Sequence, residues 1–408
     1  MHILYMIHQF YPNHYSGTER VVFGTASYMQ KLGHKVTVLT YSHEDDETYE
    51  TQQDEILYKE YMYEGLNVVA VKSNSNNYNT SYFMNSESPV HRSIIEKISP
   101  DIVHVAHMMY MHSFLKAATS FGIPYVVSLT DFWFICHRAQ MLTSAGDLCS
   151  GPEKGKRCKD MCIGLEDFYY EDRFKIAQNI LSESQANIVS SRFLENTMTH
   201  VLDNFKSNFI PYGVNFSYLD VNNKSYHADS KINFLFSGTL TKHKGIDVVI
   251  NAFKSLKNKN FELNIYGDGP MKNFVISETK AMDNVHFHGK YSKEDTKKLI
   301  QNNDVVLVPS TWYENNPIIL QEMIAANIPP IVSNIGSLPE MVEDKKTGFV
   351  FEMGNSNDLT KVLEDILEHP KQLNVIKRNM YNNYKVITIE QQVLAYLDLY
   401  INILKDDD

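Results

Sequence analysis

The chain has no excess of basic residues. Its 408 residues include 38 lysines and arginines against 49 aspartates and glutamates, so the formal net charge is −11 and the sequence pI is near 5.8. Proteins that bind nucleic acid normally carry a basic face, so we expect no nucleic-acid partner. An anionic ligand must then be held by a local group of cations.

Long apolar runs are missing as well. No stretch reaches the roughly 18 apolar residues that a membrane-spanning helix requires. The N-terminal run MHILYMIHQF is too short to span a bilayer, and it lacks the basic flank and small-residue cleavage site of a secretory signal. The sequence therefore predicts a cytoplasmic protein.

Cysteine is absent outside one segment, residues 132–164, which contains Cys136, Cys149, Cys158 and Cys162. This segment shows little periodicity and is too long for an idle loop in a compact domain. The cysteine spacings do not match paired Cys-x-x-Cys knuckles. Two interpretations stay open, a structural zinc ion held by the four cysteines or four free thiols, and stable disulfides are not expected in a reducing cytoplasm.

A chain of this length exceeds one ordinary core and predicts two domains. Short β-branched runs alternate with stretches of helical period, which indicates βαβ units and parallel sheets. The polar, aperiodic stretch 214–231 marks the boundary, so we predict domains at 1–213 and 214–385 and a final helix, 386–408, that returns toward the first. The expected strands are 3–7, 35–40, 68–71, 102–105, 125–129, 187–190, 209–211, 232–236, 262–266, 285–288, 305–308 and 331–333.

Helix boundaries follow from local signals. One helix is expected to begin near Glu19, and another at Pro89 with Ser88 as its N-cap. Beyond Phe351 the pattern is helical to the end and predicts no further strand.

The stretch from Pro309 to Val342 carries the clearest chemistry. Pro317 can open a helix at its first position, and a helix N-terminus suits a diphosphate because its N–H groups are unpaired. Glu314 precedes this N-terminus and Glu322 follows it, so the two carboxylates straddle the anion site and can accept hydrogen bonds from sugar hydroxyls. The alternative is that both glutamates are solvated charges near a helix end.

This pair of glutamates, followed by a Pro-Pro-x-x-Ser strand and Gly336-Ser337-Leu338-Pro339-Glu340, resembles the signature of glycosyltransferase family 4. The resemblance implies the GT-B fold, in which two Rossmann-like domains with parallel sheets face a central cleft. It also implies a retaining, metal-independent hexosyltransferase without an organic cofactor.

The resemblance extends to the start of the second half. The run from Ser237 to Gly245 is similar to the family's phosphate loop, and Lys244 matches the lysine that contacts the donor diphosphate. Thr239 stands where the family usually has arginine. The residues that the resemblance assigns to the nucleotide sugar are Gly17, Gly238, Thr239, Lys244, Gly267, Asn315, Asn316, Pro317, Ile318 and Glu322.

In the first half, the run from Asp101 to His107 resembles the family's Asp-x-Val-His-x-His strand end, and His104 is the matching histidine. Asp131 follows another strand, where Thr130 replaces a family histidine. The resemblance implies catalytic roles for Glu314, Lys244, Asp131 and His104. A hydrogen-bonded core histidine is the alternative for His104, and a capping role is the alternative for Asp131.

The resemblance implies a nucleoside-diphosphate sugar as co-substrate, with UDP the commonest base among relatives, and a glycan or lipid-linked acceptor. Synthesis of a surface polysaccharide or glycoconjugate is the expected role. A lipid-linked acceptor leaves a peripheral contact with the inner face of the membrane open. An epimerase or phosphorylase of the same fold and a non-catalytic glycan-binding relative are the rival functions.

Overall fold

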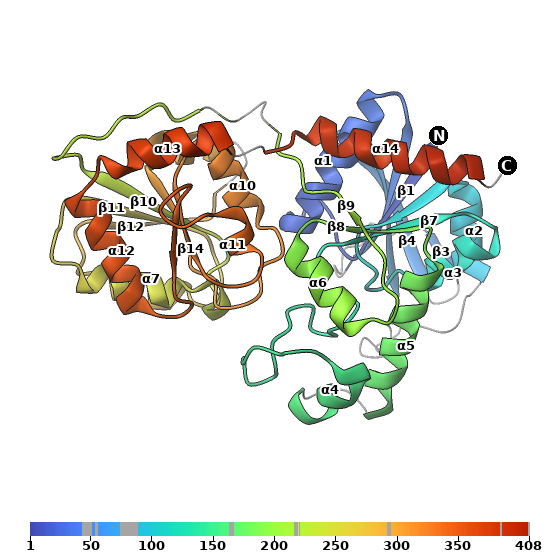
Figure 1. Cartoon of the computed structure of the whole chain (residues 1–408). Coiled ribbons are helices and arrows are strands. Elements are labelled where there is room, and N and C mark those ends of the chain that lie inside the picture. The colour runs from blue at the N-terminus through green and yellow to red at the C-terminus, as the bar shows by residue number, and fades with distance from the viewer. Residues whose placement is uncertain are drawn as a thin grey trace. The chain divides into compact units, whose positions relative to one another are not determined.

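The computed structural model divides the chain into two units. Unit 1 is Met1–Gly213 with Ile389–Asp408, and unit 2 is Val214–Thr388 (Figure 1). The structure describes residues 1–42, 51–53, 56–73, 89–162, 167–215, 219, 221–291, 295–383 and 386–406. The predicted N-cap Ser88 and the last two residues of the segment 132–164 lie outside these ranges.

Unit 1 is built on a sheet with the strand order β3-β4-β5-β2-β1-β6-β7-β8-β9. Its pairs are parallel from β5 to β9, while β4 runs antiparallel to both β3 and β5. All six residues of β1 are buried, as expected for a strand covered on both faces. The strands are β1 His2–Ile7, β2 Lys35–Tyr41, β3 Thr51–Gln53, β4 Ile56–Tyr63, β5 Leu66–Ser73, β6 Ile102–Val105, β7 Tyr125–Leu129, β8 Ala186–Val189 and β9 Asn208–Phe209.

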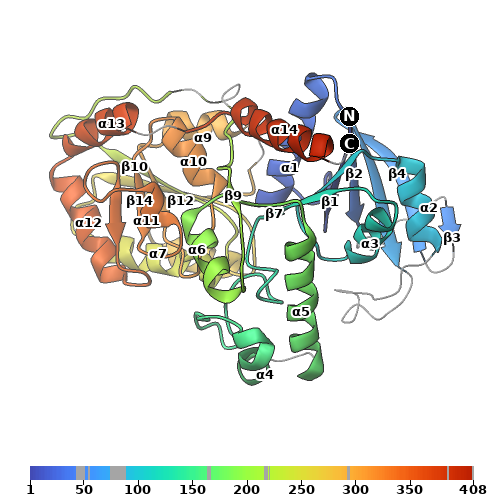
Figure 2. The same cartoon turned by 45° about the vertical axis from the view of Figure 1, so that its right-hand side comes forward.

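The last helix, α14 (Ile389–Asp406), is part of the unit 1 core although it follows unit 2 in the chain. Val393, Tyr396 and Tyr400 are buried in the same cluster as β1 and the apolar face of α1 (Gly17–Lys31). Both views show α14 beside α1 (Figure 1 and Figure 2). The remaining helices of unit 1 are α2 Pro89–Ile98, α3 His112–Ser120, α4 Lys156–Met161, α5 Asp167–Glu183 and α6 Arg192–Val201.

Unit 2 has an all-parallel sheet with the order β12-β11-β10-β13-β14-β15. Helix connections between parallel strands give the βαβ pattern that the sequence predicts. Its strands are β10 Ile232–Ser237, β11 Phe261–Tyr266, β12 Val285–Gly289, β13 Val305–Val308, β14 Pro330–Ser333 and β15 Phe349–Phe351. Its helices are α7 Ile246–Ser255, α8 Lys272–Thr279, α9 Thr296–Asn302, α10 Ile318–Ala325, α11 Leu338–Met341, α12 Ser356–Glu368 and α13 Gln372–Asn383.

Each sheet has one point at which the strand order reverses direction. In unit 1 the chain builds outward from β1 to β2 and β5, then returns to place β6 on the other side of β1. In unit 2 the equivalent neighbours are β10 and β13. Ligands of open α/β sheets bind beyond the carboxyl ends of the strands at such switch points. The fold therefore selects the residues that follow β1, β6, β10 and β13.

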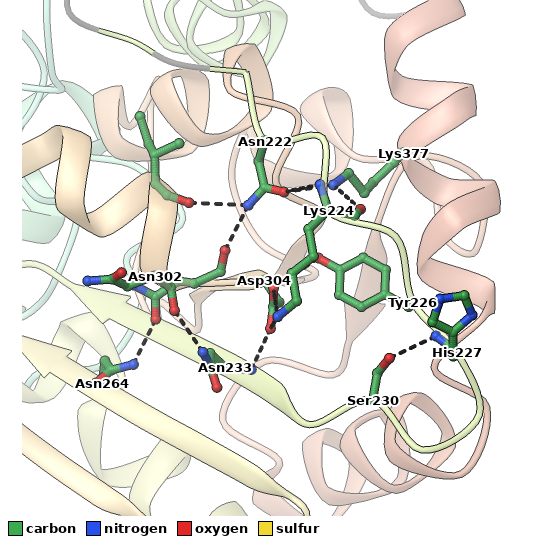
Figure 3. A network of polar contacts seen from close by, with 12 residues as sticks. Asn222, Lys224, Tyr226, His227, Ser230, Asn233, Asn264, Asn302, Asp304 and Lys377 are labelled. Carbon is green, nitrogen blue, oxygen red and sulfur yellow. Dashed lines mark hydrogen bonds and ion pairs between the residues drawn. The ribbon is translucent and has the colours of Figure 1, made fainter.

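A network of polar contacts holds the segment that enters unit 2 against the rest of that unit (Figure 3). Asp304, just before β13, accepts hydrogen bonds from the Lys224 ammonium at 2.8 Å, the Tyr226 hydroxyl at 3.1 Å and the Asn233 backbone N–H at 2.9 Å. Lys377 of α13 donates to the Asn222 side chain at 2.9 Å and to the Lys224 carbonyl at 2.8 Å. This network lies at the amino ends of β10 and β13 and stabilises the unit away from the strand ends that bind ligands.

The predicted fold class, α/β with two parallel sheets, is confirmed. The structure adds strands that the sequence did not predict. The hairpin of β3 and β4 has a mixed polar and apolar pattern, and β15 has only three residues, which end at Phe351, where the predicted helical region begins. Strands as short as β3 and β15 leave a weak periodic signal because each has few residues.

Candidate active site

The switch point of unit 2 brings Lys244 and Glu314 together. Lys244 ends a short 3₁₀ turn, Lys242–Lys244, after β10, and Glu314 lies in the loop between β13 and α10. The Nζ atom of Lys244 is 2.7 Å from Oε1 of Glu314. Two further donors reach the same oxygen, the Ser310 hydroxyl at 2.6 Å and the Trp312 indole N–H at 2.8 Å. We call Lys244, Ser310, Trp312 and Glu314 the Lys244 cluster.

These contacts keep Glu314 ionised. Its side chain is buried, and burial alone would raise the pKa of the carboxyl group. The Lys244 ammonium and the hydrogen bonds from Lys244, Ser310 and Trp312 outweigh that effect and hold the pKa below its ordinary value. The site therefore holds an ionised carboxylate and a cation side by side. A polar, charged ligand can replace their contact with each other by its own contacts to both.

Trp312 is a member of the site that the sequence reasoning missed. Besides donating to Glu314, its ring lies 4.7 Å from the Lys244 ammonium, a cation–π contact, and 4.9 Å from the His243 ring. Burial is the main cause that lowers the pKa of His243, and the Lys244 charge adds to it. The sequence does contain a signal for it, because Trp312 is one of only two tryptophans in the chain and stands two positions before the predicted catalytic Glu314.

Glycines let backbone segments approach closely beside the cluster. Gly267 has φ +145°, and a Cβ there would lie 1.9 Å from the Gly238 carbonyl oxygen. Gly238 follows β10 and Gly267 follows β11, so the two predicted glycines pack against each other at adjacent strand ends. Thr239 is exposed in the same loop. A side chain at Gly267 would block this approach, whereas the Cβ position of Gly238 has nothing within 4 Å.

The start of α10 differs by one residue from the prediction. Pro317 is the N-cap, with φ −68° and ψ 118°, and Ile318 is the first helical residue. Asn315 and Glu322 are buried, and the Asn316 side chain accepts a hydrogen bond from Gln321. The shift has a simple reason, since ψ of Pro317 is extended while its carbonyl already accepts the first helical hydrogen bonds.

The switch point of unit 1 gathers a second polar group. His8 follows β1, His107 follows β6 and Asp131 follows β7, while Glu19 comes from the first turn of α1. The His107 Nε2 atom is 3.1 Å from Asp131 Oδ2, and the two histidine rings have centroids 4.0 Å apart. The His8 Nε2 atom is 3.8 Å from Glu19 Oε1. We call His8, Glu19, His107 and Asp131 the His107 cluster.

His104, the predicted catalytic histidine, is not part of this cluster. It points into the core of unit 1, where its Nδ1 atom bonds the Tyr400 hydroxyl and its Nε2 atom bonds the Ser128 hydroxyl at 2.6 Å. Burial lowers its pKa to about 3, so it stays neutral. The histidine at the strand end is His107, three positions later, because β6 is buried along its whole length and only residues beyond Val105 reach its end.

The predicted glycine of the first loop, Gly17, begins α1, with Ser16 as the N-cap. The Ser16 hydroxyl and the Gln9 amide both donate to the carboxylate of Glu19, which is fully buried. Thr130, the residue that replaces a family histidine, donates to the Ala106 carbonyl at 3.3 Å. Ser16 thus orients Glu19, while Thr130 bonds to the local backbone.

The predicted zinc site is not supported. Across the described ranges, no three histidine, cysteine, aspartate or glutamate side chains are grouped so as to hold a metal ion, and all four cysteines are free thiols. Burial raises the pKa of Cys158 to about 12 and also that of Cys136, which opposes the thiolate form that binds zinc. A small cavity beside Cys158 is lined by Ile135, Tyr170 and Phe174 and also by the polar side chains of His137 and Arg173.

In the part of the chain that the structure describes, no helix is both long and apolar enough to span a bilayer.

Comparison with known families matches both halves of the chain. Residues 15–218 match the profile of Glycosyltransferase Family 4, and residues 220–383 match that of Glycosyl transferases group 1. The first of these covers half of the chain.

Among curated proteins, an uncharacterised 41.2 kDa protein from the cps region of Klebsiella pneumoniae is 29% identical over 36% of this chain and 40% of its own length. An uncharacterised glycosyltransferase of Methanocaldococcus jannaschii is 30% identical over 41% of this chain and 44% of its own. The amylovoran biosynthesis glycosyltransferase of Erwinia amylovora is 26% identical over 41% and 43%. The chain thus spans less than half the length of these curated relatives.

Solved structures match along the whole chain. Sucrose-phosphate synthase from Thermosynechococcus elongatus superposes with a TM-score of 0.74 at 16% identity, over 99% of both chains. Anabaena HepE in complex with UDP-glucose gives 0.68 at 16% identity, over 98% of this chain and 99% of its own. The fold is GT-B.

Proposed function

The chain belongs to glycosyltransferase family 4, and on that premise we propose that it transfers a hexose, with retention and without a metal ion, from a nucleoside-diphosphate sugar to a glycan or lipid-linked acceptor. The Lys244–Glu314 pair at the switch point of unit 2 is the observation that carries the proposal. It places a cation and an ionised carboxylate at the strand ends where an open sheet binds its ligand.

Unit 2 would hold the donor. Lys244 would leave Glu314 to contact the diphosphate, together with the N–H groups at the start of α10, and would stabilise the charge that the leaving nucleotide gains. Glu314 and Glu322 would accept hydrogen bonds from hydroxyl groups of the sugar and the ribose. The glycine pair Gly238 and Gly267 would admit the nucleotide close to the backbone. Anabaena HepE, a neighbour in fold, is solved in complex with UDP-glucose, which supports a nucleotide sugar as ligand.

The acceptor would bind at the His107 cluster of unit 1, with Asp131 as the residue that contacts it. The bond between the anomeric carbon and the phosphate oxygen would break through an oxocarbenium-like transition state, and the acceptor oxygen would bond to that carbon from the face that the phosphate leaves. The hydroxyl proton of the acceptor would pass to the leaving phosphate. Relatives named for amylovoran biosynthesis and for a cps region support a surface polysaccharide as product, and a UDP-sugar is the donor we favour.

A screen of nucleotide sugars tests this proposal. UDP-glucose, UDP-galactose, UDP-N-acetylglucosamine and GDP-mannose are each measured for the rise in Tm that they cause and for nucleotide release. A ligand that binds only the folded state raises Tm. We expect one of them to do both, while an epimerase would change the sugar without nucleotide release and a phosphorylase would require inorganic phosphate.

Variants tie the activity to the site. Lys244→Ala and Glu322→Ala should lower nucleotide release at least tenfold, whereas Lys254→Ala should not. Lys254 is a matched control because it also pairs with a glutamate, Glu278, but at the exposed surface between α7 and α8. Unchanged turnover in Lys244→Ala and Glu322→Ala would refute the assignment of the site, even if the chain proved to be a transferase.

A further inference from the structure

The His107 cluster occupies the switch point of unit 1, between β1 and β6. The backbone N–H of His107 donates to the Met6 carbonyl of β1 at 3.2 Å, which fixes the start of the β6 loop against the neighbouring strand. His8 leaves β1 at the same place, and its ring lies against that of His107. The position alone makes this strand end a ligand site.

The tautomer of His107 follows from its two hydrogen bonds. The backbone N–H of Met109 donates to its Nδ1 atom at 3.3 Å, so Nδ1 is the acceptor of the ring. The proton of the neutral imidazole is then on Nε2, which faces Asp131 Oδ2 at 3.1 Å. His107 is buried, so its ring is held in place by packing and acts as a fixed donor to the carboxylate.

Asp131 is held from both sides. Its Oδ2 atom accepts from His107, and its Oδ1 atom accepts from the Trp133 backbone N–H at 2.8 Å. The side chain is 30% exposed, in contrast to 4% for His107. A carboxylate has about four acceptor positions, so two fixed donors orient the plane of the group and leave its outer positions for a hydroxyl donor.

Resting on the transfer function above, we propose that His107 is a positioning residue that orients Asp131 to accept a hydrogen bond from the reacting hydroxyl of a neutral sugar acceptor. Asp131 is the partly exposed carboxylate of the cluster, and its negative charge favours an uncharged polyol over a phosphate-bearing group. His107 acts through Asp131, and the hydroxyl would contact only the carboxylate.

The test compares two reactions of the same donor. With the nucleotide sugar that the screen identifies, transfer to p-nitrophenyl hexosides is measured beside hydrolysis of the donor by water, and the rise in Tm with UDP reports donor binding. His107→Leu and Asp131→Asn should lower kcat/KM for the hexoside at least tenfold. The rise in Tm with UDP should stay within twofold of the wild type, and hydrolysis should fall less than transfer to the hexoside.

Two variants serve as controls. His107→Gln should recover hexoside transfer to within threefold of the wild type, because its amide N–H can donate to Asp131 from a similar position. His369→Leu removes another histidine that lies 3.1 Å from an aspartate, Asp365, but at an exposed end of α12, and it should behave as the wild type.

Equal transfer by His107→Leu and the wild type would overturn the proposal. So would an equal loss of hydrolysis, an inactive His107→Gln, or a wild type that hydrolyses the donor but uses no neutral hexoside. Failure of the proposed transfer function gives a different result. The wild type would then neither gain stability from any nucleotide sugar nor release its nucleotide. The proposed role of His107 would be refuted together with the transfer function.

Discussion

Gly245 lies directly against Pro309, and a Cβ atom on Gly245 would be 1.9 Å from the carbonyl oxygen of Pro309. This contact joins the loop after β10 to the end of β13. It brings Lys244 and Glu314 within hydrogen-bonding distance although 70 positions separate them in the chain.

Gly245→Ala should therefore destabilise unit 2 far more than the same substitution at Gly354. The alanine would meet both the left-handed strain at φ +73° and the clash with Pro309, whereas Gly354, at φ +74°, has nothing within 4 Å of its Cβ position. We expect Gly354→Ala to cost about 1 kcal/mol and Gly245→Ala about 2 kcal/mol more, as measured by urea unfolding. Equal costs for the two variants would contradict the close approach.

Lys244→Met should leave a buried carboxylate without its cation. Breaking such a pair costs on the order of 3 kcal/mol of unfolding free energy, and the double variant Lys244→Met/Glu314→Gln should regain part of this loss because no buried charge remains. Urea unfolding of the single and double variants at pH 7 measures the difference. A double variant less stable than Lys244→Met would show that Glu314 does not depend on Lys244.

Trp312→Phe should separate the two contacts of the indole. The phenyl ring keeps an aromatic face beside Lys244 but loses the N–H that donates to Glu314. Because that hydrogen bond helps to lower the pKa of Glu314, the acidic limb of the pH–rate profile should move to higher pH and kcat/KM should fall roughly tenfold. Trp312→Leu, which also removes the ring, should lose more. Identical profiles for the wild type and Trp312→Phe would rule out this role.

The stability of unit 1 should fall in acid because of His104. Its pKa is about 3 in the folded chain and near 6.5 when unfolded, so below pH 6.5 the unfolded state binds the extra proton. The contribution of neutral His104 to the free energy of unfolding is fully present above pH 6.5, and it is lost progressively as the pH falls toward 3. Urea unfolding between pH 7 and pH 4 should show a flatter dependence for His104→Gln than for the wild type, with the exposed His369→Gln unchanged. A parallel pH dependence in His104→Gln would contradict the assignment.

The fold class and the residues of unit 2 could be predicted because their signals are local. Glu314, Pro317 and Glu322 lie within one short stretch, and Lys244 follows a single apolar strand. His107 and Trp312 could not be predicted in the same way, since their roles depend on which strands are neighbours and on where a buried strand ends. His104 and His107 have the same side chain. They differ in position, because His104 lies within the buried strand β6 and belongs to the core, whereas His107 follows the end of that strand.

Unit 2 is inserted between two parts of unit 1, since Val214 and Thr388 pair as a bridge where the chain enters and leaves it. A ribosome therefore completes unit 2 before it makes Tyr396 and Tyr400, which are almost wholly enclosed in the unit 1 core. Until α14 is made, the apolar face of unit 1 that it covers is exposed. A released chain truncated after residue 388 should be far more sensitive to protease in its first 200 residues than in its second half.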